Sequence, residues 1–182
     1  MTSVQHTAPQ HTATPGDGLG TGTLVLATVT TGLTAGVFVD WSNTIMPGLS
    51  DVDDRTFVAT FRALDAAITN PLFLGVEFTG ALVLTGLSAV LHRRADQRQV
   101  LMWVGAALVG ILVVWGVTFG VNEPLNEKLR SAGTLQTDAD YAAARALLNE
   151  AKWTAWNNVR AGASTAAFGC LAWALAIHRR AR

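Results

Sequence analysis

Charged residues are missing from four separate stretches of this chain, and that feature constrains its fold more than any other. The stretches are residues 24–39, 82–91, 99–122 and 161–177. A helix needs roughly 20 mainly apolar residues to cross the hydrocarbon core of a bilayer. With one polar residue allowed inside some spans, the pattern predicts four membrane-spanning helices, at about residues 22–45, 71–92, 100–121 and 156–178.

The composition agrees with a membrane protein and argues against a soluble one. Half of the 182 residues are hydrophobic and only 14% are charged, whereas about a quarter are charged in soluble proteins. A soluble amphipathic helix would also show a polar residue every third or fourth position, and residues 101–121 lack that pattern. Because lipid cannot hydrogen-bond a backbone, we expect an all-α fold in which the four helices form one transmembrane bundle.

Basic residues near the span ends predict the orientation. They cluster in residues 92–98 and 178–182, and such clusters favour the cytoplasmic side. Four spans then place both termini in the cytoplasm of a protein of the cytoplasmic (inner) membrane, and residues 46–70 and 122–155 outside. The 13 basic and 13 acidic residues balance, so nothing predicts a nucleic-acid partner, and the oligomeric state stays open.

The segments outside the spans also carry signals. Residues 1–20 resemble a disordered tail without the basic start of a secretory signal, so the first span is predicted to be retained. Short amphipathic helices are expected in both outer connections. In residues 53–69 apolar positions recur at helical spacing, with Asp65 on the polar face, while Ala-rich residues 138–152 are predicted to begin with Asp138 as N-cap and to run into the last span. Asn70 is predicted to cap the second span, and Pro124 to end the third.

Polar side chains gather at the outer ends of all four predicted spans. The predicted pocket is formed by Asp40, Asn43, Asn70, Glu77, Asn122, Asn126, Asn157 and Arg160, with Trp41, Trp153 and Trp156 as walls. Glu77 lies about 10 Å into its helix, and an intramembrane acid usually faces the bundle interior. Arg160 is the obvious partner for Asp40 or Glu77. The alternatives are a structural ion pair and tryptophans that only anchor the helices at the interface.

Metal and cofactor motifs are scarce. The four histidines are His6, His11, His92 and His178, all outside the predicted pocket, which disfavours haem and His-rich iron or copper sites and leaves a carboxylate-only metal site open. No nucleotide-binding or serine-hydrolase motif is present, and the single cysteine excludes an internal disulfide. The Gly32–Gly36 pair favours close helix packing over a ligand role.

Several short motifs occur in a fixed order. They are Trp41-Ser42-Asn43, Met46-Pro47-Gly48-Leu49, Asn70-Pro71-Leu72-Phe73, Asn122-Glu123-Pro124-Leu125-Asn126 and Trp153-x-x-Trp156-Asn157-x-x-Arg160. Together they resemble the DUF1772, or anthrone oxygenase-like, family of small integral membrane proteins over about residues 24–177. The resemblance implies a four-helix membrane protein, and its characterised fungal members oxidise anthrones to anthraquinones without an established cofactor.

The resemblance also implies site residues. Asn122, Asn126, Trp156, Asn157 and Arg160 occupy the matching motif positions, as do Asn43 and Asn70. The chain departs from the family pattern at Glu123, where an apolar residue is usual, and Asp40 and Glu77 belong to no motif.

Two hypotheses follow. The first is a cofactor-independent oxidoreductase, a monooxygenase that takes dioxygen and a lipophilic, anthrone-like or phenolic substrate from the membrane lipid. Asp40 or Glu77 would be the base, and Arg160, Asn122 and Asn157 would hold the enolate oxygen. Trp41 and Trp156 would stack on the substrate, and the remaining contacts are Asn43, Asn70, Asn126 and Trp153. The second is a non-enzymatic protein whose polar cluster is structural or binds a lipid or small amphiphile.

Overall fold

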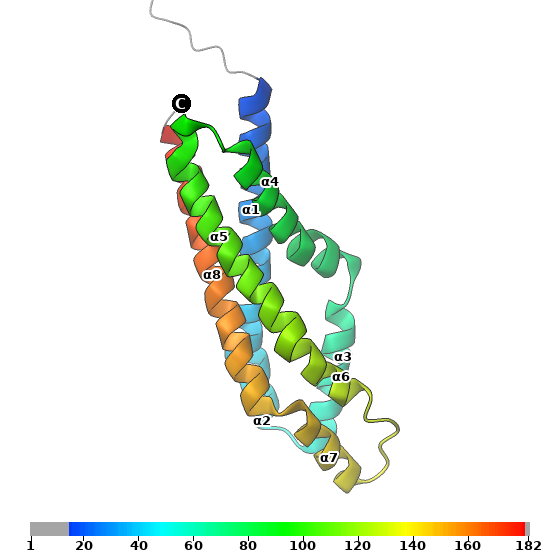
Figure 1. Ribbon diagram of the computed structural model, residues 1–182. Coiled ribbons are helices and arrows are strands. Elements are labelled where there is room, and N and C mark those ends of the chain that lie inside the picture. Colours follow the sequence, from blue (N-terminus) through cyan, green and yellow to red (C-terminus); the bar gives the residue numbers. More distant parts are fainter. Residues whose placement is uncertain (1–14, 181–182) are drawn as a thin grey trace, which may run out of the picture.

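Four long helices form an antiparallel bundle in the computed structural model, which describes residues 15–180 (Figure 1). The principal segments are α1 (Pro15–Asp40), α4 (Gly80–Leu91), α5 (Arg98–Val117) and α8 (Glu150–Arg180). No strand occurs between residues 15 and 180. Four helical stretches are long and apolar enough to cross a membrane, at Gly18–Ser50, Leu72–Leu91, Ala95–Arg130 and Asp138–Arg180. The predicted all-α, four-helix architecture is therefore confirmed.

The helices start and end at somewhat different positions from those predicted. α1 begins at Pro15, seven residues before the expected start of the first span, and the rest of the predicted tail, residues 1–14, lies outside the described residues. The start of α1 and the end of α8 lie at the same end of the bundle (Figure 1). We call this the terminal end, and the opposite end the capped end.

Small residues bring the helices close together in the terminal half. α8 packs against both α1 and α5, and α4 packs against α1. A Cβ added at Gly110 would lie 3.0 Å from the Ala163 carbonyl oxygen, and one at Gly32 would lie 2.9 Å from the Phe168 ring. Gly32 therefore has the predicted packing role, whereas Gly36 is exposed and has open space around it.

Three π-helical segments interrupt the α-helices in the capped half. They are η1 (Trp41–Ile45), η2 (Leu72–Thr79) and η4 (Thr118–Asn122), which follow α1, precede α4 and follow α5 respectively. π-Helical turns are rare and occur frequently at functional sites. Their gathering at one level of the bundle marks this level as different from the terminal half.

Pro124 does not end the third span as predicted. The helix continues through η4 into α6 (Glu123–Arg130), with Pro124 in the first turn of α6. Proline normally breaks a helix because it lacks an N–H and its ring clashes with a carbonyl of the preceding turn. Here the preceding turn is already wider, since the Glu123 N–H donates to the Thr118 carbonyl five residues back. The π turn therefore lets the chain pass through the proline without stopping.

Four short helices cover the capped end. They are α2 (Met46–Ser50), α3 (Asp54–Ile68), α6 and α7 (Asp138–Leu148), while η3 (Ala95–Gln97) lies in the short connection before α5. Arg62 of α3 donates to the Leu129 carbonyl of α6 with an Nη2–O distance of 2.6 Å. Arg145 of α7 pairs with Asp54 at 3.1 Å and with Glu150 at 2.6 Å. These bonds tie the connections into one cap layer.

The predicted amphipathic helices in the connections are present. The Asp53 side chain accepts from the Thr56 N–H at 3.0 Å and so caps α3, and its hydrogen bonds with Thr56 hold the pKa of this carboxyl below its usual value. Phe57 and Phe61 are buried, as expected for the apolar face. Asp65, expected on the polar face, is buried as well.

The α7 helix differs from its prediction at both ends. Thr137, not Asp138, is the N-cap, and it forms a capping box with Asp140. Asn149 adopts a left-handed backbone conformation with φ of 52° and ends α7. α7 is therefore separated from α8 rather than running into it.

Candidate functional site

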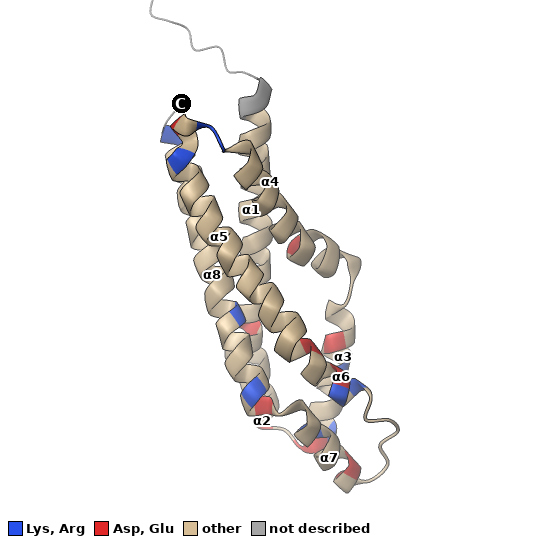
Figure 2. Ribbon diagram, in the orientation of Figure 1, with Lys and Arg blue, Asp and Glu red and all other residues tan. Residues whose placement is uncertain are grey.

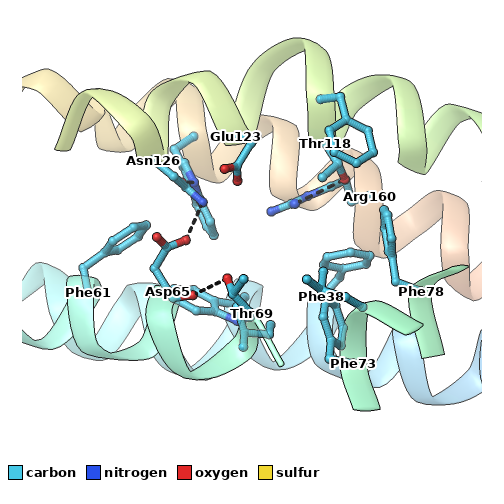
Figure 3. A pocket seen from close by; sticks show the side chains of 15 residues that line it. Phe38, Phe61, Asp65, Thr69, Phe73, Phe78, Thr118, Glu123, Asn126 and Arg160 are labelled. Carbon is cyan, nitrogen blue, oxygen red and sulfur yellow. Dashed lines mark hydrogen bonds between the residues drawn. The ribbon is translucent and has the colours of Figure 1, made fainter. Parts of the chain in front are cut away.

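A cavity of about 210 Å³ lies in the capped half, enclosed by residues from all four spans and from α3 (Figure 3). It exceeds the cavities of about 150 Å³ that can hold a benzene ring. The side chains that line it are Phe38, Trp41, Phe61, Asp65, Ile68, Thr69, Phe73, Leu74, Phe78, Thr118, Phe119, Glu123, Asn126, Trp153 and Arg160. Most of this surface is aromatic or aliphatic, and its polar groups are few.

The guanidinium of Arg160 is the most unusual group in the cavity. Arg160 is only 6% exposed, and it forms no ion pair with any carboxylate in the described part of the chain. Its Nη2 donates to Asn157 Oδ1 at 2.8 Å and its Nη1 to Thr118 Oγ1 at 3.4 Å, while Nε is buried without a partner. A buried cation of this kind usually requires an anionic partner.

Two aromatic rings partly stabilise the buried positive charge of Arg160. The Arg160 guanidinium carbon lies 4.5 Å from the centre of the Phe38 ring and 5.4 Å from that of Trp153. Such cation–π contacts stabilise a desolvated cation by about 2 kcal/mol. No carboxylate within residues 15–180 forms an ion pair with the guanidinium, so its free donor positions can attract an anionic oxygen.

Asn157 fixes the position of Arg160. It is fully buried, and its Nδ2 donates to the Phe38 carbonyl at 3.0 Å and to Ser42 Oγ at 2.7 Å. Its Oδ1 is therefore turned toward Arg160, because the amide nitrogen is held by α1 and η1. This network joins α8 to the first span beside the cavity.

An acidic group faces Arg160 from the other side of the cavity (Figure 3). Asp65 is 5% exposed and accepts from Asn126 Nδ2 at 2.8 Å and from Arg130 Nη1 at 2.6 Å. Arg130 also pairs with Glu123 through that residue's Oε1, and with Glu127 at 3.0 Å. Glu123 Oε2 accepts no hydrogen bond within residues 15–180. The cavity therefore has one cationic end and one acidic end.

Trp153 and two asparagines connect the acidic end to α8. The Trp153 Nε1 donates to Asn126 Oδ1 at 2.6 Å, so both ends of the Asn126 amide are engaged. Asn122, fully buried behind the wall, donates to the Trp153 carbonyl at 3.1 Å. The Asn122 and Asn126 positions thus orient a tryptophan that forms part of the cavity surface.

Comparison with known protein families identifies the family of this chain. The family model described as anthrone oxygenase matches residues 71–170, more than half of the chain. The chain belongs to the anthrone oxygenase family. No curated protein and no solved structure matches it. The matched range contains Glu123, Asn126, Asn157 and Arg160, while Phe38 and Asp65 lie before it.

The structure brings together only part of the predicted site. Trp41, Asn126, Trp153 and Arg160 line the cavity, and Asn122 and Asn157 support it from behind. The remaining predicted residues are not among its lining: Asp40, Asn43, Asn70, Glu77 and Trp156. Asp40 and Asn43 are exposed, Glu77 is half-buried, and Trp156 is 39% exposed. Asn70 has its predicted capping role, since its Oδ1 accepts from the Phe73 N–H at 3.0 Å.

Helix geometry explains why the two predicted acids lie outside the cavity. Phe38 of α1 lines the cavity, and Asp40, two residues later, is turned about 200° from it at the α-helical pitch. In η2 both Phe73 and Phe78 line the cavity, five residues apart with ring centres separated by 6.0 Å. Glu77 immediately precedes Phe78, so its side chain is turned by roughly 100° from that ring at the α-helical pitch, and Glu77 does not line the cavity.

The sequence prediction included Trp41 and Trp153 but missed the phenylalanines of the cavity wall and the acidic end. Asp65 follows Phe61 by four residues, a spacing that puts both on one helix face, and this signal could have identified it. Glu123 was noted only as a departure from the family pattern. Phe38, Phe73 and Phe78 carried no signal beyond hydrophobicity.

The described residues contain no group of three or more His, Cys, Asp and Glu side chains suited to a metal ion. His92 and His178 lie at the terminal end, far along the chain from the cavity, with ring centres 5.0 Å apart. The two other histidines, His6 and His11, lie outside the described residues.

Proposed function

We propose that this chain is a cofactor-independent oxygenase that converts an anthrone-like or phenolic aromatic compound to a quinone with dioxygen. The observation that carries the proposal is the buried guanidinium of Arg160, which has no carboxylate partner and faces an aromatic cavity with acids on its opposite side. Membership of the anthrone oxygenase family supports the same chemistry.

The cavity residues suggest how the substrate is held. Phe38, Phe73 and Phe78 provide ring edges and faces for a flat aromatic molecule. The carbonyl oxygen of the substrate lies at Arg160, where negative charge on that oxygen is stabilised as it develops. Asn157 acts as a positioning residue, because it touches the guanidinium and not the cavity.

Glu123 is the base in this proposal, in place of Asp40 and Glu77. It lines the cavity and has a free carboxylate oxygen, Oε2, within the described chain. Asp65 is less suited because both of its oxygens already accept hydrogen bonds, one from Asn126 and one from Arg130. A carboxylate accepts a proton readily when the resulting carbanion is stabilised by a nearby cation.

The reaction balances without a further reductant. Glu123 removes a proton from the methylene carbon, and the electron pair delocalises onto the oxygen beside Arg160. The carbanion gives one electron to dioxygen, and the radical and superoxide combine to form a carbon–oxygen bond. The peroxide accepts a proton, the remaining C–H proton leaves to the base, and the O–O bond breaks. One oxygen atom becomes the new quinone carbonyl and the other leaves as water.

Oxygen consumption by purified protein in detergent tests the proposal. An anthrone should be oxidised faster than in buffer alone, and Arg160→Gln should lower the rate by about 10²-fold or more, as expected for loss of an oxyanion donor. Asp40→Asn is the matched control outside the cavity and should keep the rate within about twofold. A folded Arg160→Gln protein with the full rate would contradict the proposal. Binding of an anthraquinone without any turnover would instead support the non-enzymatic amphiphile-binding hypothesis.

The proposal includes an orientation in the cytoplasmic membrane. Basic residues gather at the terminal end (Figure 2). The connection before α5 and the start of α5 contain Arg93, Arg94 and Arg98, and the last turn of α8 contains Arg179 and Arg180. This supports a cytoplasmic location for both termini. The cavity then lies toward the outer surface. A cysteine introduced at Lys128 should react with a membrane-impermeant reagent in intact cells, and one introduced at Arg94 should react only after lysis; the reverse result would invert the orientation.

A further inference from the structure

The exposed apolar part of the cavity lining, here called the rim, lies on two membrane-spanning helices, and the exposed Thr69 at the end of α3 lines the cavity beside it. Leu74 of η2 is 41% exposed and Phe119 of η4 is 56% exposed, although both also line the cavity. The chain between α3 and α4 bows away from α5 at this level (Figure 1). The opening therefore lies at the side of the bundle, between two helices that face lipid.

A series of aromatic contacts leads from this rim inward to a charged group. Phe119 contacts Phe78, with ring centres 6.2 Å apart, and Phe78 contacts Phe38 at 6.4 Å. The Phe38 ring in turn packs against the Arg160 guanidinium. An aromatic path thus runs from the lipid-facing rim to the buried cation.

The π-helical segments place the opening there. Leu74 lies in η2 and Phe119 in η4, so both rim residues belong to turns wider than those of an α-helix. In the terminal half, by contrast, the same two spans pack against each other through α4 and α5. The side opening is therefore confined to the level of Arg160 and the acidic end.

We propose that the substrate enters the cavity sideways from the bilayer between Leu74 and Phe119, with its oxygen-bearing edge leading toward Arg160. This inference rests on the proposed function for the nature of the substrate. It narrows the substrate class to flat, lipophilic polycyclic compounds that partition into the membrane and carry an ionisable or enolisable oxygen on one edge. Polyanionic, water-soluble aromatics would not pass an apolar opening in contact with lipid.

Cysteine protection in liposomes tests the route without any turnover. Leu74→Cys and Phe119→Cys are made separately on a Cys170→Ala background, and Leu112→Cys serves as the control because Leu112 is 52% exposed on α5 but does not line the cavity. The probe is a monohydroxyanthraquinone, which resembles the expected product and is not oxidised further. Its binding is measured independently by quenching of tryptophan fluorescence.

A lipophilic maleimide should label all three variants, whereas a charged, membrane-impermeant maleimide should label them slowly. At a probe concentration about ten times its dissociation constant, labelling at positions 74 and 119 should slow by about tenfold, with no change at position 112. Two results would overturn the inference: unchanged labelling at positions 74 and 119 under saturating probe, or rapid labelling of both by the charged reagent. Each result is read on variants that melt within a few degrees of the parent protein.

A second variant keeps the route testable if either cysteine substitution disturbs the fold. Phe119→Trp enlarges a rim side chain and should slow association and dissociation of the probe together, leaving the dissociation constant nearly unchanged. A change in the dissociation constant with an unchanged association rate constant would point to a direct contact rather than a passage, and would overturn the route. These measurements use binding only, so they test the route even if the protein consumes no oxygen. Oxygen consumption without protection of the cysteines would overturn the proposed route but not the proposed function.

Discussion

The two halves of the bundle consist of similar helices, but the helices pack closely in one half and surround a cavity in the other. In the terminal half, regular α-helices meet through small side chains, and residues such as Leu24, Val104 and Leu171 are fully buried. In the capped half, three spans change to π-helical turns and the side chains between them are aromatic. The first half therefore has a closed core, and the second encloses a cavity.

This difference shows that the cavity depends on local helix pitch as well as on side-chain size. Phe38, Phe73, Phe78 and Phe119 are large enough to fill a core. The π turns direct several of them around a common space, and the buried Arg160 adds a charge that apolar side chains cannot cover. A uniform α-helical bundle of the same composition would be expected to close on itself.

The largest expected effect is a loss of enzymatic activity when an acid inside the cavity is substituted. The matched control is the substitution of an acid outside the cavity. Glu123→Gln should lower the rate of anthrone oxidation by about 10²-fold or more, because general-base catalysis typically contributes that much. Glu77→Gln, on the wall of the same bundle but outside the cavity, should keep the rate within about twofold. Oxygen consumption under saturating substrate measures both. Equal losses of oxidation rate in the two variants would contradict the assignment of Glu123, rather than Glu77, as the base.

The close packing of the terminal half predicts the next largest effect. Gly110→Leu should lower the free energy of unfolding by about 1–3 kcal/mol, the usual cost of overpacking, because its Cβ would lie 3.0 Å from the Ala163 carbonyl oxygen, a backbone atom.

Gly105→Leu is the matched control on the same helix, since nothing lies within 4 Å of a Cβ at that position. Thermal unfolding in detergent compares the two variants. Equal midpoints of thermal unfolding would show that α5 and α8 can separate without loss of stability, and would contradict close packing in the terminal half.

The smallest effect expected is the loss of one hydrogen bond at the acidic end. Trp153→Phe removes the Nε1 donor to Asn126. The lost bond should lower the free energy of unfolding by about 1 kcal/mol, the usual net value, and the smaller ring at this buried position adds to the loss. Trp173→Phe is the control, because Trp173 is 48% exposed and lies away from the cavity. If the two variants unfold at the same temperature, Asn126 is held by Asp65 alone.

Features that depend on hydropathy and on local capping could be predicted from the sequence. The four spans, the apolar face of α3 and the Asn70 cap each follow from the type of a few neighbouring residues. Arg160 and Asn157 were also predicted together, because their spacing of three residues puts them on one face at any pitch close to that of an α-helix.

The position of Glu123 at the acidic end could not be predicted because it depends on a departure from regular geometry, whereas the four-residue spacing from Phe61 could have identified Asp65. Asp40 and Glu77 were placed by depth alone, and depth does not determine which way a side chain points. The π turn in η2 brings Phe73 and Phe78, five residues apart, to the same cavity, and the turn in η4 carries the chain past Pro124 so that Glu123 and Asn126 face α3. Single-sequence patterns contain no clear sign of such turns.

The turn at Thr118–Asn122 has a further consequence for how this site can vary. A π turn is equivalent to one additional residue within an α-helix. If the same five residues were wound at the regular α-helical pitch, everything after them would rotate by roughly 90° relative to α5. Glu123 and Asn126 would then leave the cavity without either being substituted. Deleting one residue together with that change would return them to nearly the same direction, so the acidic end depends on the match between the pitch of this turn and the number of residues in it.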